Sequence, residues 1–203
     1  LKMRILCIGG SGNISTSVVK LGLSQGHEVI ILNRHGDQEL EALGARHIPC
    51  DVYEGTQLKD AVAGLDIDAA IDFICYTLED AKRDFEAFNG KVRQFIFISS
   101  CTVYQKPCFV TPITEDVPLK NPYSDYARNK MACEFYFLER YREDDFPVTI
   151  VRPSHTYGEK KLVVGPLMGW QVPHWTFAQR ILDGKPVIVH DTGRSLWTVT
   201  HSD

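Results

Sequence analysis

The sequence predicts an α/β fold in which a doubly wound parallel sheet carries helices on both faces. Short apolar runs alternate with segments of helical periodicity from Arg4 to Pro153. The runs lack the polar alternation of a half-solvated sheet, as expected when both faces are covered. Regular strand–helix alternation favours right-handed crossovers between parallel strands.

The elements can be placed from these patterns. We expect strands at 4–9, 28–33, 45–50, 69–74, 94–99 and 148–153. We expect helices at 13–25, 37–43, 55–64, 78–89 and 124–143. From about Lys160 the rhythm changes, and a helix-like segment (176–184) and a strand-like one (186–190) follow. This predicts one domain over 1–160 and the start of a smaller, loop-rich region over 161–203.

Composition limits the classes of function. The chain has 203 residues, is 44% hydrophobic and has a formal net charge of −4. It is long enough to bury a core, and its mild acidity gives no general reason to expect nucleic acid or membrane partners. No apolar run approaches the ~20 residues that span a bilayer, and we expect that no signal peptide opens the chain. We expect a cytoplasmic protein.

The cysteines predict no metal centre. Six are scattered along the chain without a CxxC pair, several of them in apolar runs. We interpret them as reduced, mostly buried thiols. Metal binding is the alternative, but the seven histidines form no ligand spacing with the cysteines.

The stretch "RILCIGGSGNIS" predicts a phosphate site. Gly9, Gly10 and Gly12 end the first strand, where they allow a tight turn and close approach of the backbone to a pyrophosphate. The helix that follows points its first N–H groups at the phosphate charge. An ordinary strand-to-helix turn is the alternative. The expected phosphate-binding residues are Gly9, Gly10, Ser11, Gly12, Asn13 and Ile14.

A second pattern predicts acid–base chemistry. Tyr126 and Lys130 are four residues apart in a helical segment, which puts them on one face. A nearby ammonium and a cationic nicotinamide ring would both favour the phenolate of Tyr126. "FISSCTVY" supplies a hydroxyl at the end of the fifth strand, where ligands bind in open α/β sheets. An ordinary amphipathic helix is the alternative for the Tyr–Lys spacing alone.

The whole chain resembles the extended short-chain dehydrogenase/reductases, specifically the NAD-dependent epimerase/dehydratase family of sugar-nucleotide enzymes. The resemblance rests on "GGSGNIS", "CDVYEGTQLKDAV", "FIFISSCTVY", "EDVPLKNPYSDYARNKMACE" and "VRPSHTYG". The glycine spacing is GxxGxxG with Ser15 at the third glycine. The resemblance implies a Rossmann-type NAD(P)-binding domain over 1–160 and a partial substrate-binding region over 161–203. It implies Ser100 as the catalytic hydroxyl, Tyr126 as base or acid, and Lys130 as the residue that binds the nicotinamide ribose.

The cofactor is expected to be NADP or NAD, with NADP favoured. Asn33 and Arg34 end the second strand, where a carboxylate would bind the ribose of NAD and an arginine can accept a 2′-phosphate. A solvated surface arginine is the alternative. Asp51 resembles the family aspartate that binds the adenine amine, although it could equally cap the next helix. The resemblance also implies cofactor contacts at Val52, Phe73, Ile74, Pro153 and His155.

Some positions depart from the family pattern. Cys101 and Thr102 follow Ser100 where the dehydrating enzymes have Asp–Glu, which disfavours dehydration; we interpret Cys101 as a packing residue. Trp197 stands where the family has an arginine that clamps a nucleotide diphosphate, and Arg194 is a nearby substitute. The family normally continues past Asp203, so we expect that the C-terminal part of the substrate lobe is missing.

Three hypotheses follow. The first is an NAD(P)-dependent epimerase or reductase acting on a sugar-type carbinol or carbonyl. The second is a non-catalytic dinucleotide-binding protein, redox-sensing or RNA-binding, although such proteins often lose the Tyr or Lys kept here. The third is a remnant with exposed apolar surface around Trp170, Trp175 and Trp197. A homodimer through the helix at 124–143, as in the family, is compatible with each.

Overall fold

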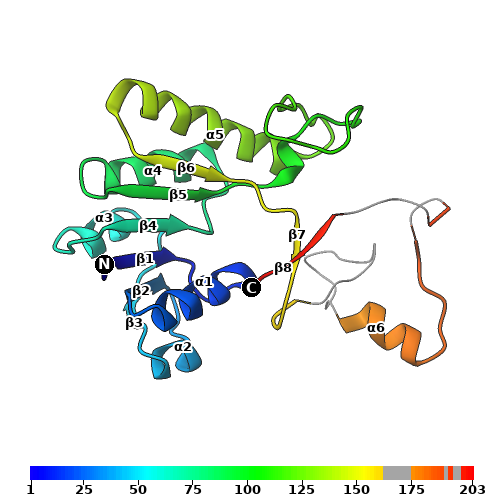
Figure 1. The fold of residues 1–203 in the computed structure, drawn as a ribbon, viewed down its shortest axis with the longest axis horizontal. Helices are drawn as coiled ribbons and strands as arrows, with labels where there is room; N and C mark the ends of the chain where they lie inside the picture. The colour runs from blue at the N-terminus through cyan, green and yellow to red at the C-terminus, as the bar shows by residue number, and fades with distance from the viewer. Residues whose placement is uncertain (162–174, 190–191, 194–197) are drawn as a thin grey trace.

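The computed structural model describes residues 1–161, 175–189, 192–193 and 198–203. Its centre is a six-stranded sheet in the order β3-β2-β1-β4-β5-β6, and all neighbouring strands are parallel (Figure 1). The strands are β1 (Arg4–Ile8), β2 (Glu28–Asn33), β3 (Arg46–Pro49), β4 (Ala69–Asp72), β5 (Gln94–Ile98) and β6 (Val148–Val151). The fold class expected from the sequence is confirmed.

Helices cover both faces of the sheet. One hydrophobic cluster contains residues of α1 (Asn13–Ser24) and α2 (Gln38–Ala42). The other contains residues of α3 (Gln57–Val62), α4 (Leu78–Phe88) and α5 (Asp125–Asp144). Consecutive strand residues point to opposite faces, so Ile30 belongs to the second cluster and Ile31 to the first, both fully buried. This double burial is why the strands show continuous apolar runs.

Aromatic rings fix α5 against the sheet. Phe97 of β5 and Phe137 of α5 have ring centroids 5.1 Å apart, and Phe95 lies 5.4 Å from Phe137. These rings are fully buried. Such offset aromatic contacts add to the free energy gained by burial alone. The packing sets the height of α5 relative to the end of β5, where the site is built.

The region after β6 differs from the expectation in part. The predicted helix at 176–184 is confirmed as α6 (Trp175–Leu182). The strand predicted at 186–190 is wrong over 186–189, which has no strand partner; His190 lies outside the described residues. Ile188 and Val189 are exposed, so their apolar character buries no sheet face. Arg194, Trp170 and Trp197 also lie outside the described residues, whereas Trp175 is half exposed.

Three short elements were not expected. A 3₁₀ turn, η1 (Cys101–Val103), follows β5. A separate parallel pair joins β7 (His155–Tyr157) to β8 (Val199–His201), and it lies beside α1 beyond the carboxyl ends of the main strands (Figure 1). Each has three residues, too few for a periodic pattern.

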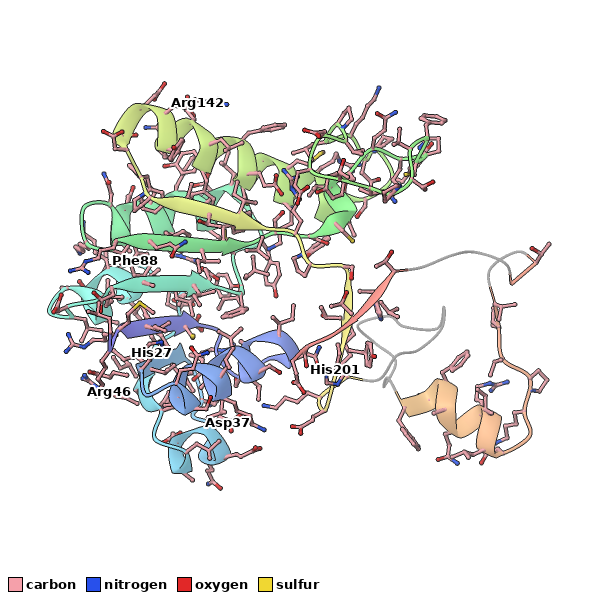
Figure 2. The ribbon with its side chains drawn as sticks, viewed as in Figure 1. His27, Asp37, Arg46, Phe88, Arg142 and His201 are labelled. Carbon is pink, nitrogen blue, oxygen red and sulfur yellow. The ribbon has the colours of Figure 1, made fainter. Side chains whose placement is uncertain are left out.

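The common strand direction defines two edges of the sheet. Figure 2 shows His27 and Arg46 at the amino edge and His201 beyond the carboxyl edge. Ligands in open α/β sheets bind at the carboxyl edge. None of the described helices is long and apolar enough to cross a bilayer.

Candidate active site

The glycine turn after β1 has room only for glycine at its first two positions. Gly9 has φ +76°, and a Cβ there would lie 2.6 Å from Ile74 Cγ2. A Cβ on Gly10 would lie 2.9 Å from Ile31 Cγ2. The backbone therefore turns directly against β2 and against the residue Ile74 that follows β4, and α1 starts at Asn13. Its first turn is free of acidic side chains, as an anion site requires.

Ser15 fixes this turn with its hydroxyl. Its Oγ accepts a hydrogen bond from Gly12 N at 2.7 Å and donates one to Gly9 O at 2.8 Å. A glycine at this position would lack both bonds. The departure from a third glycine thus stabilises the turn and also crowds Gly12, since a Cβ on Gly12 would lie only 3.2 Å from Ser15 Oγ.

A cavity of about 540 Å³ opens at the carboxyl edge. Its walls come from the glycine turn, the ends of β4, β5 and β6, and the first turns of α5. The predicted site residues that line it are Gly9, Gly12, Asn13, Ile14, Phe73, Ile74, Ser100, Tyr126, Lys130, Pro153 and His155. The phosphate-binding turn and the predicted acid–base residues thus share one cavity.

Tyr126 and Ser100 lie together on this wall. Ser100 caps η1, and its Oγ accepts hydrogen bonds from Thr102 N (3.2 Å) and Thr102 Oγ1 (3.0 Å). Tyr126 is 39% exposed and lines the cavity. Burial raises the pKa of Tyr126, and its hydrogen bond with Ser100 opposes that rise. The phenol is therefore protonated at neutral pH in this structure.

Lys130 is placed differently from the expectation that it lowers the pKa of Tyr126. Its Nζ donates to Cys75 O at 2.6 Å and to Ile98 O at 2.8 Å. It lies 5.9 Å from the centre of the Tyr126 ring. Burial lowers the pKa of Lys130 itself. In this arrangement burial dominates the pKa of Tyr126, because the ammonium is directed at backbone carbonyls.

A buried ion pair supports the strand end that carries Ser100. Glu134, one turn beyond Lys130 on α5, is fully buried; it accepts a hydrogen bond from the Ser99 hydroxyl and is bound by both Nε and Nη2 of Arg152. Arg152 also donates to Tyr104 Oη at 3.1 Å. Ser99 and Ser100 follow β5 and both line the cavity, but the hydroxyl of Ser99 donates to Glu134, whereas that of Ser100 accepts from Thr102.

The outer end of the site holds Asn33 and Arg34. Asn33 Nδ2 donates to Ser11 Oγ at 3.1 Å, which joins β2 to the glycine turn. The Arg34 side chain is 68% exposed, and its one ion pair among the described residues is a long one, 4.0 Å, with Asp51. Asp51 does not cap α3, which begins after Thr56; its Oδ1 accepts from Tyr53 N instead.

Six predicted residues do not line the cavity: Gly10, Ser11, Asn33, Arg34, Asp51 and Val52. Gly10 and Val52 are buried, whereas the others form the outer rim just described.

Sequence reasoning missed several lining residues, among them Tyr76, Thr102 and Lys161. Tyr76 lies in the loop that follows β4, so its place after a strand end was an available signal. Lys161 carried no such signal. Cys101, which was expected to be a packing residue, is partly buried and also lines the cavity. Four other cysteines are buried and Cys108 is exposed; all six are free.

The sheet order and the glycine turn after the first strand define the class of Rossmann-type α/β proteins. The family model of the NAD dependent epimerase/dehydratase family matches residues 5–203, and the chain belongs to that family.

The chain is similar to a curated reductase and to curated epimerases. It is 27% identical to 2′-dehydrokanamycin reductase of Streptomyces kanamyceticus, over 99% of this chain and 55% of the reductase. It is 26% identical to UDP-glucose 4-epimerase of Lactobacillus helveticus, over 77% of this chain and 52% of the epimerase. The chain thus spans about half the length of these curated relatives.

Solved structures share the fold. Pal from Bacillus thuringiensis has a TM-score of 0.82 at 24% identity, covering 98% of this chain and 70% of Pal. A short-chain dehydrogenase/reductase superfamily protein from Agrobacterium tumefaciens, with bound NAD, has a TM-score of 0.65 at 26% identity. The match covers 76% of this chain and 50% of that protein.

Proposed function

We propose that the chain forms the cofactor-binding and catalytic part of an NAD(P)-dependent epimerase or reductase of sugar-type substrates. One observation carries the proposal: Tyr126, Ser100 and Lys130 line the same cavity as the glycine turn. In this proposal residues 1–160 form the dinucleotide-binding domain, and 161–203 belong to the substrate-binding region.

The glycine turn fits a dinucleotide. Its backbone lies tightly against Ile31 and Ile74 on the inner side. On the outer side Asn13, at the first position of α1, has buried Nδ2 and Oδ1 atoms without hydrogen-bond partners in the described structure. A phosphate could accept from the amide nitrogen and from the first N–H groups of α1. A bound nicotinamide dinucleotide supplies or accepts the hydride.

The protein's own residues would handle the proton. Tyr126 Oη would exchange a proton with the reacting oxygen, and Ser100 Oγ would donate a hydrogen bond to that oxygen. Lys130 would bind the nicotinamide ribose and favour the Tyr126 phenolate once both are engaged. Cys101 and Thr102, next to Ser100, offer no carboxylic acid to a leaving hydroxyl, so we propose oxidation and reduction without dehydration.

NADP is the proposed preference. The outer end of β2 has Asn33 in place of a carboxylate, and the exposed Arg34 is available for a 2′-phosphate. The names of the relatives, a dehydrokanamycin reductase and UDP-glucose 4-epimerases, favour a sugar or nucleotide-sugar substrate.

A binding titration tests the proposal. The purified chain is titrated separately with NADPH and NADH, following nicotinamide fluorescence, and is then screened against keto-sugars. Binding of NADPH tighter than NADH is expected. Tighter NADH binding would overturn the proposed preference for NADP but not the assignment as an NAD(P)-dependent epimerase or reductase. Failure of both dinucleotides to bind would contradict the proposed function.

A further inference from the structure

The ammonium of Lys130 is buried without a carboxylate partner among the described residues. The residue is 1% exposed, and its Nζ hydrogen bonds go to the carbonyls of Cys75 and Ile98. An isolated buried charge is costly unless its surroundings compensate for lost hydration. Two carbonyl dipoles supply part of that compensation, and something else must supply the rest.

Three aromatic rings surround this ammonium. Nζ lies 4.8 Å from the ring centre of Phe97, 4.9 Å from Tyr76 and 5.9 Å from Tyr126. Each is within the ~6 Å at which a ring face attracts a cation. We call Tyr76, Phe97 and Tyr126 the aromatic cage. Desolvation strengthens cation–π attraction, so the aromatic cage stabilises a buried ammonium more than it would an exposed one.

Tyr76 is the member of the cage with no other assigned role. Phe97 is fully buried in the core, and Tyr126 is the proposed acid–base residue. Tyr76 lines the cavity, with its ring centroid 6.4 Å from that of Tyr126. Its backbone N donates to Asp80 Oδ2 at 2.9 Å, a carboxylate at the start of α4. This bond holds the backbone that carries the ring at the start of α4, and the ring itself lies over Lys130 Nζ.

We propose that Tyr76 is a positioning residue that keeps the Lys130 ammonium charged and in place through its ring face. This deepens the proposed function and rests on it, because that function uses the Lys130 ammonium to bind the nicotinamide ribose and to favour the Tyr126 phenolate. The inference concerns the face of the ring; the hydroxyl of Tyr76 has no part in it.

The charges around Lys130 agree with this role. Burial lowers the pKa of Lys130, and the neighbouring carboxylates of Asp72 and Asp80 oppose the shift. Burial also raises the pKa of Tyr76, so its ring is neutral at physiological pH. Removing the ring face would lower the pKa of Lys130 further and bring its deprotonation closer to neutral pH.

A pair of substitutions separates ring face from hydroxyl. Tyr76→Phe keeps the face, and we expect kcat/KM and dinucleotide Kd within about twofold of the native chain. Tyr76→Leu removes the face, and we expect kcat/KM to fall by about tenfold, with the alkaline limb of the pH profile moved to lower pH. Equal losses in the two variants would overturn the proposal, because the hydroxyl would then be the active group.

A double-mutant cycle tests the contact without any turnover. The unfolding equilibrium constants of Tyr76→Phe and Tyr76→Leu are compared in the native background and in Lys130→Met. We expect the Phe-to-Leu change to be about fivefold more costly when Lys130 is present. Equal cost in both backgrounds would overturn the contact. If Lys130→Met does not fold, the Phe and Leu variants of the native chain decide the question through the pH dependence of unfolding.

The two proposals fail separately. A chain that binds neither dinucleotide contradicts the proposed function, and the cycle still decides whether Tyr76 stabilises Lys130. A chain that turns over normally as Tyr76→Leu contradicts the positioning role and leaves the proposed function intact.

Discussion

Glu134 and Arg152 form a bidentate ion pair behind the cavity, with Arg152 Nε 3.0 Å from Oε1 and Nη2 2.7 Å from Oε2 of Glu134. The pair joins α5 to the residue that follows β6. Because Glu134 also accepts from Ser99, the ends of β5 and β6 and the helix carrying Tyr126 are held to one another. The geometry of the candidate site therefore depends on the Glu134 carboxylate, which does not line the cavity.

Glu134→Gln should destabilise the fold. The substitution leaves the Arg152 guanidinium beside a neutral amide, and unpairing a buried ion costs about 3 kcal/mol. Denaturant unfolding measures the loss. Glu143 lies on the exposed side of the same helix and pairs with Arg140. Glu143→Gln is therefore the matched control, and we expect it to change the free energy of unfolding by less than about 0.5 kcal/mol. Similar effects of the two substitutions would contradict this account.

Tyr126→Phe should abolish turnover while leaving the dinucleotide bound. The phenol oxygen is the proposed proton carrier, and such a group contributes at least about 100-fold to the rate. The ring remains in place, so the Kd measured by fluorescence should change little. Tyr123→Phe is the control, since Tyr123 is 77% exposed just before the same helix. Retained turnover in Tyr126→Phe would contradict the assignment of Tyr126 as the proton carrier.

Arg34→Ser should weaken NADPH binding selectively. A charge-assisted hydrogen bond to the 2′-phosphate contributes about 1.5–3 kcal/mol, or roughly tenfold or more in Kd, and NADH has no such group. Arg93→Ser is the control, because Arg93 is also exposed with one long ion pair but precedes β5 at the amino edge. Equal weakening of NADPH and NADH would speak against a phosphate-reading role.

Asp84→Asn should remove a pH dependence of stability. Burial, reinforced by Asp72, raises the pKa of Asp84 well above its usual value of 3.8, while Arg83 opposes the shift. A raised folded-state pKa means that stability is present below pH ~4 and is lost as pH rises through the folded-state pKa. The free energy of unfolding of the native chain should therefore fall with rising pH relative to Asp84→Asn.

Urea titrations at several pH values measure this difference. The amide keeps an oxygen for Arg83, which bonds Asp84 Oδ1 at 2.6 Å. Asp66→Asn, with a fully exposed side chain, should change the free energy of unfolding by less than about 0.5 kcal/mol. A constant offset between Asp84→Asn and the native chain at every pH would show that Asp84 does not titrate in this range.

The main sheet could be predicted from the sequence because each strand buries both faces. Ile30 and Ile31 are consecutive and equally buried, so the sequence of β2 is an unbroken apolar run. The strand at 186–190 was misread by the same rule, since Pro186 to Val189 are apolar without a neighbouring strand. A short apolar run carries no information about whether a partner exists.

The candidate site was predictable where a motif names its residues and not where the fold brings them together. Tyr126, Lys130 and Ser100 follow from spacing and resemblance. The partners of Lys130 do not, because Cys75 and Ile98 are 55 and 32 residues away and contribute backbone atoms. Likewise, Glu134 lies four residues after Lys130, but its partner Arg152 is reached only through the packing of α5 on β6.

Because the six strands run in one direction, the cavity lies at the carboxyl edge of the sheet and the amino edge is remote from it; we call the amino edge the idle edge. Gly90, at the idle edge between α4 and β5, has open space around it and a positive φ of 70°. A side chain on Gly90 would be strained at this φ, but a short peptide inserted next to it would extend into open space at the edge away from the cavity.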